Sequence, residues 1–246
     1  MRENAFIDIH SHIMPGMDDG AKSLAESLGM LRQAQEEGIG AVVLTPHQKP
    51  GHRCVTAAEI KKRTDDLRKE AKREGIGVEL YPGGELYYCH GLEKRLRAGK
   101  APTLAESGYV LVEFMPGEEF RYIRNAADAL LCAGYRPLIA HAERYGRLMQ
   151  EGEPERAEEL VEMGCLFQVN SASLMGGDGW ALRKWSRLLV KNRLAHFVAT
   201  DAHREQGGRT VQLRKCAAFL GRKYGTEYAA KLLFENAKAL LDNRKI

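Results

Sequence analysis

The stretch Phe6-Ile7-Asp8-Ile9-His10-Ser11-His12 passes from an apolar run into two histidines. A short apolar run of this kind is typical of a buried strand. Side chains at positions i and i+2 of an extended chain lie on one face, so His10 and His12 can reach one metal ion together. The loop Asp18-Asp19-Gly20 follows, and one of its carboxylates can reach the same face.

The same order of apolar run and potential ligand recurs along the chain. Imidazole and carboxylate groups together suit divalent ions such as Zn, Mn and Fe. The further runs are 41–45 before His47, 78–81 before Glu85, 109–112 before Glu113, 137–140 before His141, and 196–200 before Asp201 and His203.

Helical patterns separate the predicted strands; the capping box 56–59 predicts a helix start, and Gly38 and Gly75 predict helix ends. The strand ends, including one at Asn170, follow at intervals of about 30 residues, the length of a βα unit. We therefore predict an α/β fold, a seven-stranded parallel (β/α)7 TIM-like barrel formed by one domain, residues 1–246. An open doubly wound sheet is the alternative, but its ligands usually come from few strands.

Composition excludes several classes of function. The net charge is +4, and Lys and Arg alternate with Glu as in 59–63, which indicates solvated helix faces and no nucleic-acid partner. No apolar run approaches the roughly 18 residues of a membrane span, so we expect no membrane insertion. Residues 1–4 lead directly into a strand and leave no room for a signal peptide, which predicts a cytoplasmic protein. The five cysteines form no CxxC pair and indicate reduced thiols.

Charge arithmetic predicts the number of metal ions. One loop aspartate with Glu85, Glu113 and Asp201 supplies four negative charges, while the histidines bind as neutral ligands. Two divalent ions would make the site neutral, and three would leave it positive and attractive to a phosphate. Nine ligands also exceed the needs of two ions, so we predict three sites.

Two arginines and two cysteines bear on phosphate chemistry. Arg144 follows His141, and Arg209 follows the Asp201/His203 pair; either can bind a phosphate through two parallel hydrogen bonds or lie on the surface. Cysteine-dependent tyrosine phosphatases use a C-x5-R motif, which occurs at Cys89 and at Cys216. We predict that neither is functional, because a phosphate cradle needs open backbone N–H groups and these surroundings are bulky or helical.

The whole chain resembles the polymerase-and-histidinol-phosphatase (PHP) superfamily. Within it, the chain is similar to the bacterial manganese-dependent protein-tyrosine phosphatases of capsular and exopolysaccharide operons. The segments that carry the resemblance are 7–13, 18–20, 45–47, 82–88, 110–114, 139–145, 167–171 and 196–203.

The resemblance implies a distorted seven-stranded barrel with three divalent ions, Mn²⁺ in the first place and Fe or Zn as possibilities. It favours Asp19 over Asp18, and it implies that Arg144 and Arg209 bind the phosphate. A hydroxide bridging two ions would attack phosphorus in line, and His203 could donate a proton to the leaving phenol. The implied ligands are His10, His12, Asp19, His47, Glu85, Glu113, His141, Asp201 and His203.

The resemblance also implies the reaction, the hydrolysis of phosphotyrosine in a protein, with a bacterial tyrosine kinase of capsule or exopolysaccharide synthesis as the partner. One alternative is a small-molecule phosphoesterase such as a histidinol-phosphate phosphatase. Another is a metal-binding regulatory module without catalysis, which would have no need of nine ligands.

Overall fold

The computed structural model describes residues 5–49, 51, 54–149 and 154–246. Residues 1–4, which carry the expectation of no signal peptide, lie outside the described residues. No helix among the described residues is both long enough and apolar enough to cross a membrane.

The predicted strands and helices alternate along the described chain. The strands are β1 (Phe6–Ser11), β2 (Ile39–Leu44), β3 (His47–Gln48), β4 (Glu79–Pro82), β5 (Glu85–Tyr87), β6 (Tyr109–Glu113), β7 (Arg136–Ile139), β8 (Leu166–Asn170) and β9 (Phe197–Ala199). The helices are α1 (Leu24–Glu36), α2 (Ala57–Arg73), α3 (Leu92–Arg97), α4 (Phe120–Cys132), α5 (Glu155–Glu162), α6 (Ser171–Met175), α7 (Trp180–Lys191), α8 (Arg214–Tyr224), α9 (Thr226–Ala230) and α10 (Asn236–Leu241). Short helical turns are η1 (Leu104–Glu106), η2 (Ala142–Arg144), η3 (Gly146–Leu148) and η4 (Lys231–Glu235).

Local sequence signals explain the helix boundaries. The hydroxyl of Thr56 accepts a hydrogen bond from the Glu59 amide at 3.2 Å and caps α2, as predicted. Gly38 and Gly75 follow α1 and α2 with φ of 85° and 69°, a left-handed conformation that glycine adopts without strain. The predicted helix signals in this part of the chain are therefore confirmed.

All strand pairs are parallel, and they form two sheets. One sheet has the order β1-β2-β4, and the other has the order β3-β5-β6-β7-β8-β9. A single bridge between Ser11 and Ala202 connects the end of β1 with the segment after β9. The predicted parallel α/β architecture is confirmed, but the described residues form nine strands in two sheets and not the expected seven.

There are two extra strands because two neighbouring predicted strands are each interrupted, at corresponding positions of their pairing. Thr45 and Pro46 separate β2 from β3, and Gly83 and Gly84 separate β4 from β5. Proline has no N–H to donate to a ladder. A Cβ on Gly83 would lie 2.7 Å from Cγ1 of Val43, so the chains approach too closely there for a side chain. Pairing resumes beyond the break, where His47 lies opposite Glu85.

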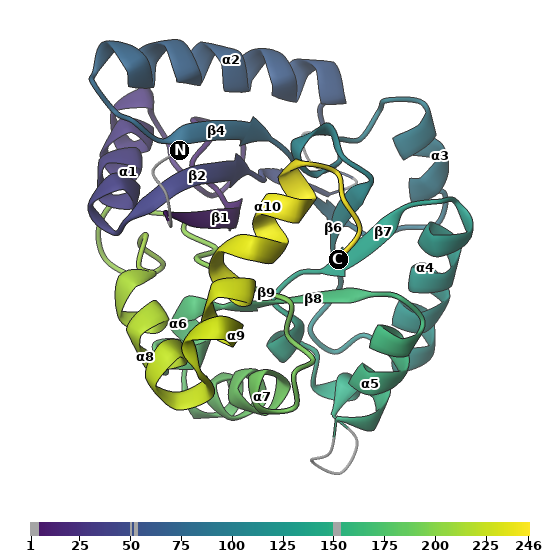
Figure 1. Cartoon of the computed structure of the whole chain (residues 1–246). Helices are drawn as coiled ribbons and strands as arrows, with labels where there is room; N and C mark the ends of the chain where they lie inside the picture. The colour runs from purple at the N-terminus through teal and green to yellow at the C-terminus, as the bar shows by residue number, and fades with distance from the viewer. Residues whose placement is uncertain (1–4, 50, 52–53, 150–153) are drawn as a thin grey trace.

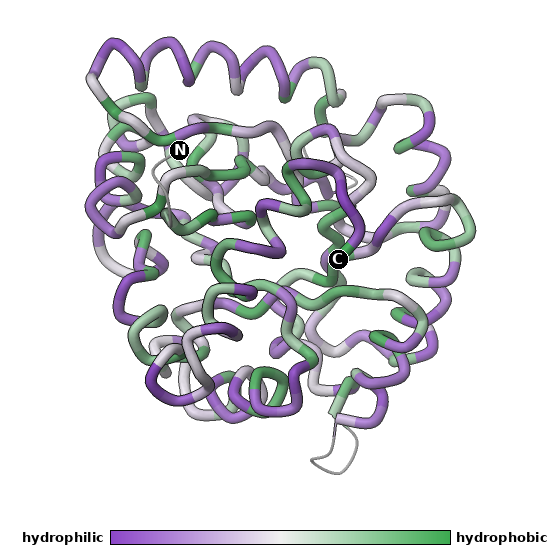
Figure 2. Tube along the Cα trace, in the orientation of Figure 1, coloured by the Kyte–Doolittle hydropathy of each residue, from purple (hydrophilic) through white to green (hydrophobic). Residues whose placement is uncertain are grey.

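Apolar side chains form two layers around the strands. One buried cluster combines strand residues such as Ile7, Ile9, Val43, Leu111 and Phe197 with residues of the C-terminal helix. A larger cluster fills the space between the strands and the surrounding helices. Figure 1 shows the helices around the strands, and Figure 2 shows hydrophilic and hydrophobic residues alternating along α2.

The C-terminal helix packs against the strands. In Figure 1, α10 lies across the middle of the strands, and its residues Ala237 and Leu240 belong to the inner cluster. The hydroxyl of Tyr109 donates a hydrogen bond to the Arg244 carbonyl at 2.6 Å and fixes the segment that follows. Tyr109 is at the start of β6 and Glu113 is at its end, so the opposite end of the strands is left for the predicted ligands.

Candidate metal centre

The structure brings all nine predicted ligands together at the carboxyl ends of the strands. The ring centroids of His12 and His203 are 3.8 Å apart, although 191 positions of sequence separate them. His10 lies within an irregularity of β1 between Asp8 and Ser11, and such bulges redirect side chains next to functional sites. Convergence of strand ends, predicted from the sequence, is therefore observed.

The ligand atoms fall into three groups, each with atoms within 4.8 Å of one another. The groups overlap, since His12 belongs to two of them and so does His47, although one imidazole nitrogen can bind only one ion. The groups are His12, Asp19, His47 and His203; His10, His12 and Asp201; and His47, Glu85 and Glu113.

Glu85 lies at the centre of the cluster and connects the groups. Its side chain is fully buried, and Oε2 lies 3.3 Å from Nε2 of both His10 and His12. Its other oxygen, Oε1, lies 2.7 Å from Nε2 of His141, the one predicted ligand outside the three groups. A buried carboxylate among imidazoles is a strong candidate for a bridging position.

Hydrogen bonds orient three of the imidazoles so that Nε2 faces the cluster. Nδ1 of His12 donates to Asp18 at 2.7 Å, and Nδ1 of His203 donates to the Asp201 carbonyl at 3.0 Å. Nδ1 of His10 donates to Oε1 of Gln168 at 2.9 Å. With the proton on Nδ1, the lone pair of Nε2 is free to bind a metal, the usual arrangement behind a histidine ligand.

Asp18 therefore supports the site while Asp19 reaches into it. Asp18 is almost fully buried and also accepts hydrogen bonds from the amides of Gly20 and His47 at 2.8 and 2.9 Å. Asp19 is 63% exposed, and its Oδ1 lies 3.5 Å from Nε2 of both His47 and His203. The geometry favours Asp19 as the ligand, in line with the sequence-based choice.

Sequence reasoning missed a buried amide network behind the ligands. The Oε1 of Gln168 accepts from the His141 amide at 2.7 Å, which fixes the orientation of this side chain. Its amide nitrogen donates to Asn170 at 2.7 Å, and Asn170 donates to Asp201 at 2.8 Å. The position of Asn170 at a predicted strand end was the signal that could have revealed this network.

Strained backbone also marks the site. His141, Asp201 and Arg209 have positive φ values of 32°, 50° and 57°. A non-glycine residue in this conformation costs of order 1 kcal/mol or more and persists only where the surrounding structure enforces it. At these three predicted site residues, the surrounding structure therefore holds the backbone in place.

The electrostatics of the cluster favour cations. Burial lowers the pKa of His47, but the neighbouring carboxylates of Glu113 and Glu85 outweigh it and raise the pKa to about 10. Burial likewise opposes the charged form of His10 and His12, yet Glu85 and Asp201 shift the pKa of both histidines upward, and Asp18 adds to the shift of His12. The carboxylates thus favour positive charge in the cluster. In the metal-free protein this charge comes from protons on the imidazoles, and metal ions can take the place of these protons.

His203 differs from the other imidazoles. Burial and the neighbouring His12 lower its pKa to about 3, so it is neutral at pH 7. Its Nε2 is buried without a hydrogen-bond partner among the described residues, and so is Oε2 of Glu85. Two such orphaned atoms within a set of nitrogen and oxygen donors fit divalent metal ions. A neutral His203 favours its role as a ligand over that of a proton donor.

Both predicted phosphate arginines lie at this cluster. Arg144 and Arg209 donate to Oδ2 of Asp201 at 3.0 and 2.8 Å, and Arg209 also contacts Oδ1 at 2.8 Å. They border a pocket of about 560 Å³ that opens over the ligands. Its lining is Met17, Asp18, Asp19, His47, Lys49, Glu113, Arg144 and Arg209.

The two C-x5-R cysteines lie in different surroundings. Cys216 is buried in α8, and burial raises its pKa to about 12, which opposes the thiolate form that a nucleophile needs. Cys89 is partly buried just before α3, and neither cysteine lines the metal pocket. These observations agree with the prediction that neither motif is functional.

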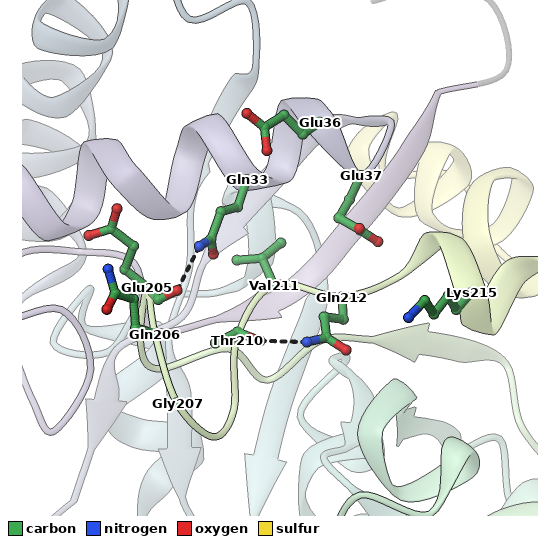
Figure 3. Close-up of a pocket in the computed structure, with 10 residues that line it drawn as sticks. All are labelled: Gln33, Glu36, Glu37, Glu205, Gln206, Gly207, Thr210, Val211, Gln212 and Lys215. Atoms are coloured by element: carbon green, nitrogen blue, oxygen red, sulfur yellow. Dashed lines mark hydrogen bonds between the residues drawn. The ribbon is translucent and has the colours of Figure 1, made fainter.

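A second pocket lies behind the segment that carries Arg209. None of the predicted ligands lines it (Figure 3); its lining is Gln33, Glu36, Glu37, Glu205, Gln206, Gly207, Thr210, Val211, Gln212 and Lys215. Within it, the Gln33 side chain donates to the Glu205 carbonyl at 2.6 Å (Figure 3). This contact ties the Arg209 segment to α1.

The comparisons with known proteins agree with this geometry. The tyrosine-protein phosphatase CpsB of Streptococcus agalactiae is 33% identical over 245 residues, covering 98% of this chain and all of that protein. The tyrosine-protein phosphatase YwqE of Bacillus subtilis is 35% identical over 240 residues, covering 98% of this chain and 93% of that protein.

A solved structure has the same fold throughout. It comes from work on YwqE from B. subtilis and CpsB from Streptococcus pneumoniae, described as unique metal-dependent tyrosine phosphatases. It superposes with a TM-score of 0.90 at 36% identity and covers 98% of this chain and 96% of that one. Residues 6–242 match the family "Capsular polysaccharide synthesis, CpsB/CapC". The chain belongs to the CpsB/CapC family of capsular polysaccharide synthesis.

Proposed function

We propose that this protein is a metal-dependent phosphatase that hydrolyses phosphotyrosine in proteins. The observation that carries the proposal is the convergence of nine imidazole and carboxylate side chains beneath two arginines at one pocket. Full-length similarity to CpsB and YwqE, which are named tyrosine-protein phosphatases, supports the same reaction.

The proposal includes three divalent ions, with Mn²⁺ as the expected metal and Fe or Zn as alternatives. When bound, such ions polarise a phosphoryl oxygen and lower the pKa of a coordinated water. The nine predicted ligands would hold these ions, and Glu85, whose carboxylate lies 2.7 Å from Nε2 of His141, would be the ligand closest to the most of the others. Asp18, Gln168 and Asn170 fix the orientation of the ligands and need not contact the metals.

Arg144 and Arg209 bind the phosphate of the substrate. Their guanidinium groups meet at Asp201, so their remaining N–H donors can grip two oxygens of one phosphoryl group. The charge that develops on these oxygens in the transition state strengthens both contacts. A phenol, with a pKa of about 10, leaves more easily than an alkoxide, so tyrosine phosphate depends little on a general acid.

The proposed partner is a protein phosphorylated on tyrosine, and specifically a bacterial tyrosine kinase of capsule or exopolysaccharide synthesis. Family membership supports the link to capsule synthesis. The proposed location is the cytoplasm, and five free cysteines suit that reducing compartment.

We also propose that the two sheets form one distorted barrel and that residues 1–246 are one domain. Strands β2 and β3 follow one line of the barrel, β4 and β5 follow the next, and the Ser11–Ala202 bridge closes the ring. If β2 and β3 count as one barrel strand, and β4 and β5 as another, the nine strands become seven. A single cooperative unfolding transition is expected, and two separate transitions would contradict one domain.

Metal removal and restoration test the function. Protein stripped with EDTA should lose turnover of p-nitrophenyl phosphate and of a phosphotyrosyl peptide, and Mn²⁺ should restore both. Histidinol phosphate, offered at the same metal loading, should be a much poorer substrate. Elemental analysis of the freshly purified protein identifies the native metal. Full turnover after stripping, or no turnover of any phosphoester with Mn²⁺, would refute the proposal.

Two cysteine variants separate this reaction from thiol chemistry. Cys89→Ser and Cys216→Ser should retain activity within about twofold, because neither side chain borders the pocket. An inactive but folded Cys89→Ser protein would instead indicate a cysteine nucleophile.

A further inference from the structure

A third cation, Lys49, borders the metal pocket together with Arg144 and Arg209. It follows β3, directly after the predicted ligand His47 and the buried Gln48. The Gln48 side chain accepts a hydrogen bond from the Val55 amide at 2.9 Å, which holds the start of this loop against the protein. Lys49 is therefore presented to the pocket from an anchored position.

Unlike the two arginines, Lys49 has no carboxylate partner among the described residues. Arg144 and Arg209 are both paired with Asp201 at 3.0 and 2.8 Å. The ammonium of Lys49 instead lies over the ring of Tyr87, 4.9 Å from its centroid. A cation–π contact holds the amine without neutralising it, so its charge remains available to a bound molecule.

The position of Lys49 separates it from the phosphate-binding arginines. Tyr87 lies opposite Glu113 in the pairing of β5 with β6, which places Lys49 at the Glu113 side of the pocket. The arginines come from the segments after β7 and β9 and meet at Asp201. When the arginines hold the phosphoryl group, Lys49 is therefore free to contact a different part of the substrate.

We infer that Lys49 determines substrate preference by binding an acidic side chain next to the phosphotyrosine of the protein substrate. This inference rests on the proposed function and specifies its substrate class, a phosphotyrosyl segment with flanking carboxylates. Lys49 contributes to the binding of the substrate and takes no part in the chemical step. An exposed or half-buried ion pair of this kind changes affinity by about fivefold.

Peptide series with two Lys49 variants test the inference. Three phosphotyrosyl peptides carry glutamate, alanine or lysine on both sides of the phosphotyrosine, and p-nitrophenyl phosphate has no flanking group. The wild-type protein should prefer the glutamate peptide in kcat/KM. Lys49→Met should lose about fivefold on that peptide through KM, with the other substrates nearly unchanged. Lys49→Glu should reverse the preference toward the lysine peptide.

Binding without turnover provides a second measurement. Peptides with a non-hydrolysable phosphonate in place of the phosphate should show the same order by fluorescence anisotropy, and added salt should reduce the difference. Lys184→Met is the matched control, because Lys184 lies 4.6 Å from the Trp185 ring centroid but does not border the pocket.

The outcomes are distinguishable. Unchanged peptide preference in Lys49→Met would overturn the inference while leaving the phosphatase function intact. An equal loss on p-nitrophenyl phosphate would also overturn it, because Lys49 would then act on the phosphate itself. No hydrolysis of any peptide by the wild-type protein would instead refute the proposed function.

Discussion

Asp18 and Asp19 are adjacent in the chain but differ in their surroundings. Asp18 is buried against the Nδ1 of His12, whereas Asp19 is exposed and faces Nε2 of His47 and His203. Burial opposes the charge of Asp18, but His12 and the backbone amides of His47 and Gly20 outweigh it and lower its pKa. Asp18 thus positions the predicted ligand His12, whereas the adjacent Asp19 is itself placed to bind a metal ion.

Asp18→Asn is expected to weaken metal binding by about 10-fold to 100-fold, the usual effect of removing the partner behind a histidine ligand. The fold should be retained, because asparagine can still accept a hydrogen bond from the Gly20 amide. Calorimetric titration of metal-free protein with Mn²⁺ measures the change. Asp65→Asn, on the exposed face of α2, is the control, and equal affinity of the Asp18 variant and the wild type would contradict the role of Asp18.

His196 is a histidine outside the metal site that affects stability. Its ring nitrogen Nδ1 accepts a hydrogen bond from the Phe167 amide at 3.2 Å, and burial lowers its pKa to about 4. The unfolded chain, with an ordinary pKa near 6.5, binds the proton more readily between these values. The contribution to stability is therefore complete above pH 6.5 and is lost as the pH falls toward 4.

His196→Asn should remove this dependence, because asparagine can accept the same hydrogen bond but does not titrate. The stability difference between wild type and variant should change by about 2–3 kcal/mol between pH 7 and pH 4. Urea denaturation of both metal-free proteins at several pH values measures this difference in the free energy of unfolding. Titration of the metal-site residues contributes equally to wild type and variant and so cancels in the difference. A constant difference across this range would show that His196 is not buried as a neutral ring.

At the scale of elements, Asp8 joins the first strand to the last. Only one bridge connects β1 with the segment after β9, and Asp8 adds hydrogen bonds from the amide and hydroxyl of Thr200 at 3.0 and 2.5 Å. The carboxylate is fully buried, and burial raises its pKa despite these donors. Asp8, two positions before His10, thus links β1 to the segment that leads to Asp201.

Asp8→Ala should destabilise the protein by about 2–3 kcal/mol, because the buried amide of Thr200 would lose its acceptor. His10 and Asp201, which follow on the two joined segments, should then bind metal more weakly. Urea denaturation measures the first effect and metal titration the second. Asp66→Ala, whose carboxylate pairs with Lys69 on the surface of α2, should change stability by less than about 0.5 kcal/mol. An equally small effect of Asp8→Ala would show that stability does not depend on the contact between Asp8 and Thr200.

At the scale of the whole molecule, the metal ions are expected to join segments from both ends of the chain. The ligands extend from His10 to His203, and four of them are carboxylates that repel one another without a cation. A ligand that binds only the folded state at 100 times its dissociation constant adds about 2.7 kcal/mol of stability.

Removal of metal with EDTA should therefore lower Tm by about 5–10 °C, and Mn²⁺ should restore it. Differential scanning calorimetry measures both values. The variant Glu85→Gln should respond less to Mn²⁺, because Glu85 connects the ligand groups. A Tm that is the same with EDTA and with Mn²⁺ would argue against metal ions at this cluster.

Much of this architecture was predictable from the amino-acid sequence. Apolar runs about 30 residues apart predicted the parallel α/β fold, because strand and helix periodicities are local. The same runs, ending in His10, His47, Glu85 and Asp201, predicted that the ligands would meet, because parallel strands point their carboxyl ends the same way. The family was recognisable for the same reason, since its motifs lie at those strand ends.

Only the tertiary structure decided the rest. The breaks at Thr45-Pro46 and Gly83-Gly84 depend on how closely two strands approach across the sheet. The tasks of Gln168 and Asn170 depend on contacts with His141 and Asp201, which lie in other segments of the chain. Sequence periodicity determines which way a side chain leaves its own strand, whereas its hydrogen-bond partner and pKa are determined by distant segments that fold against it.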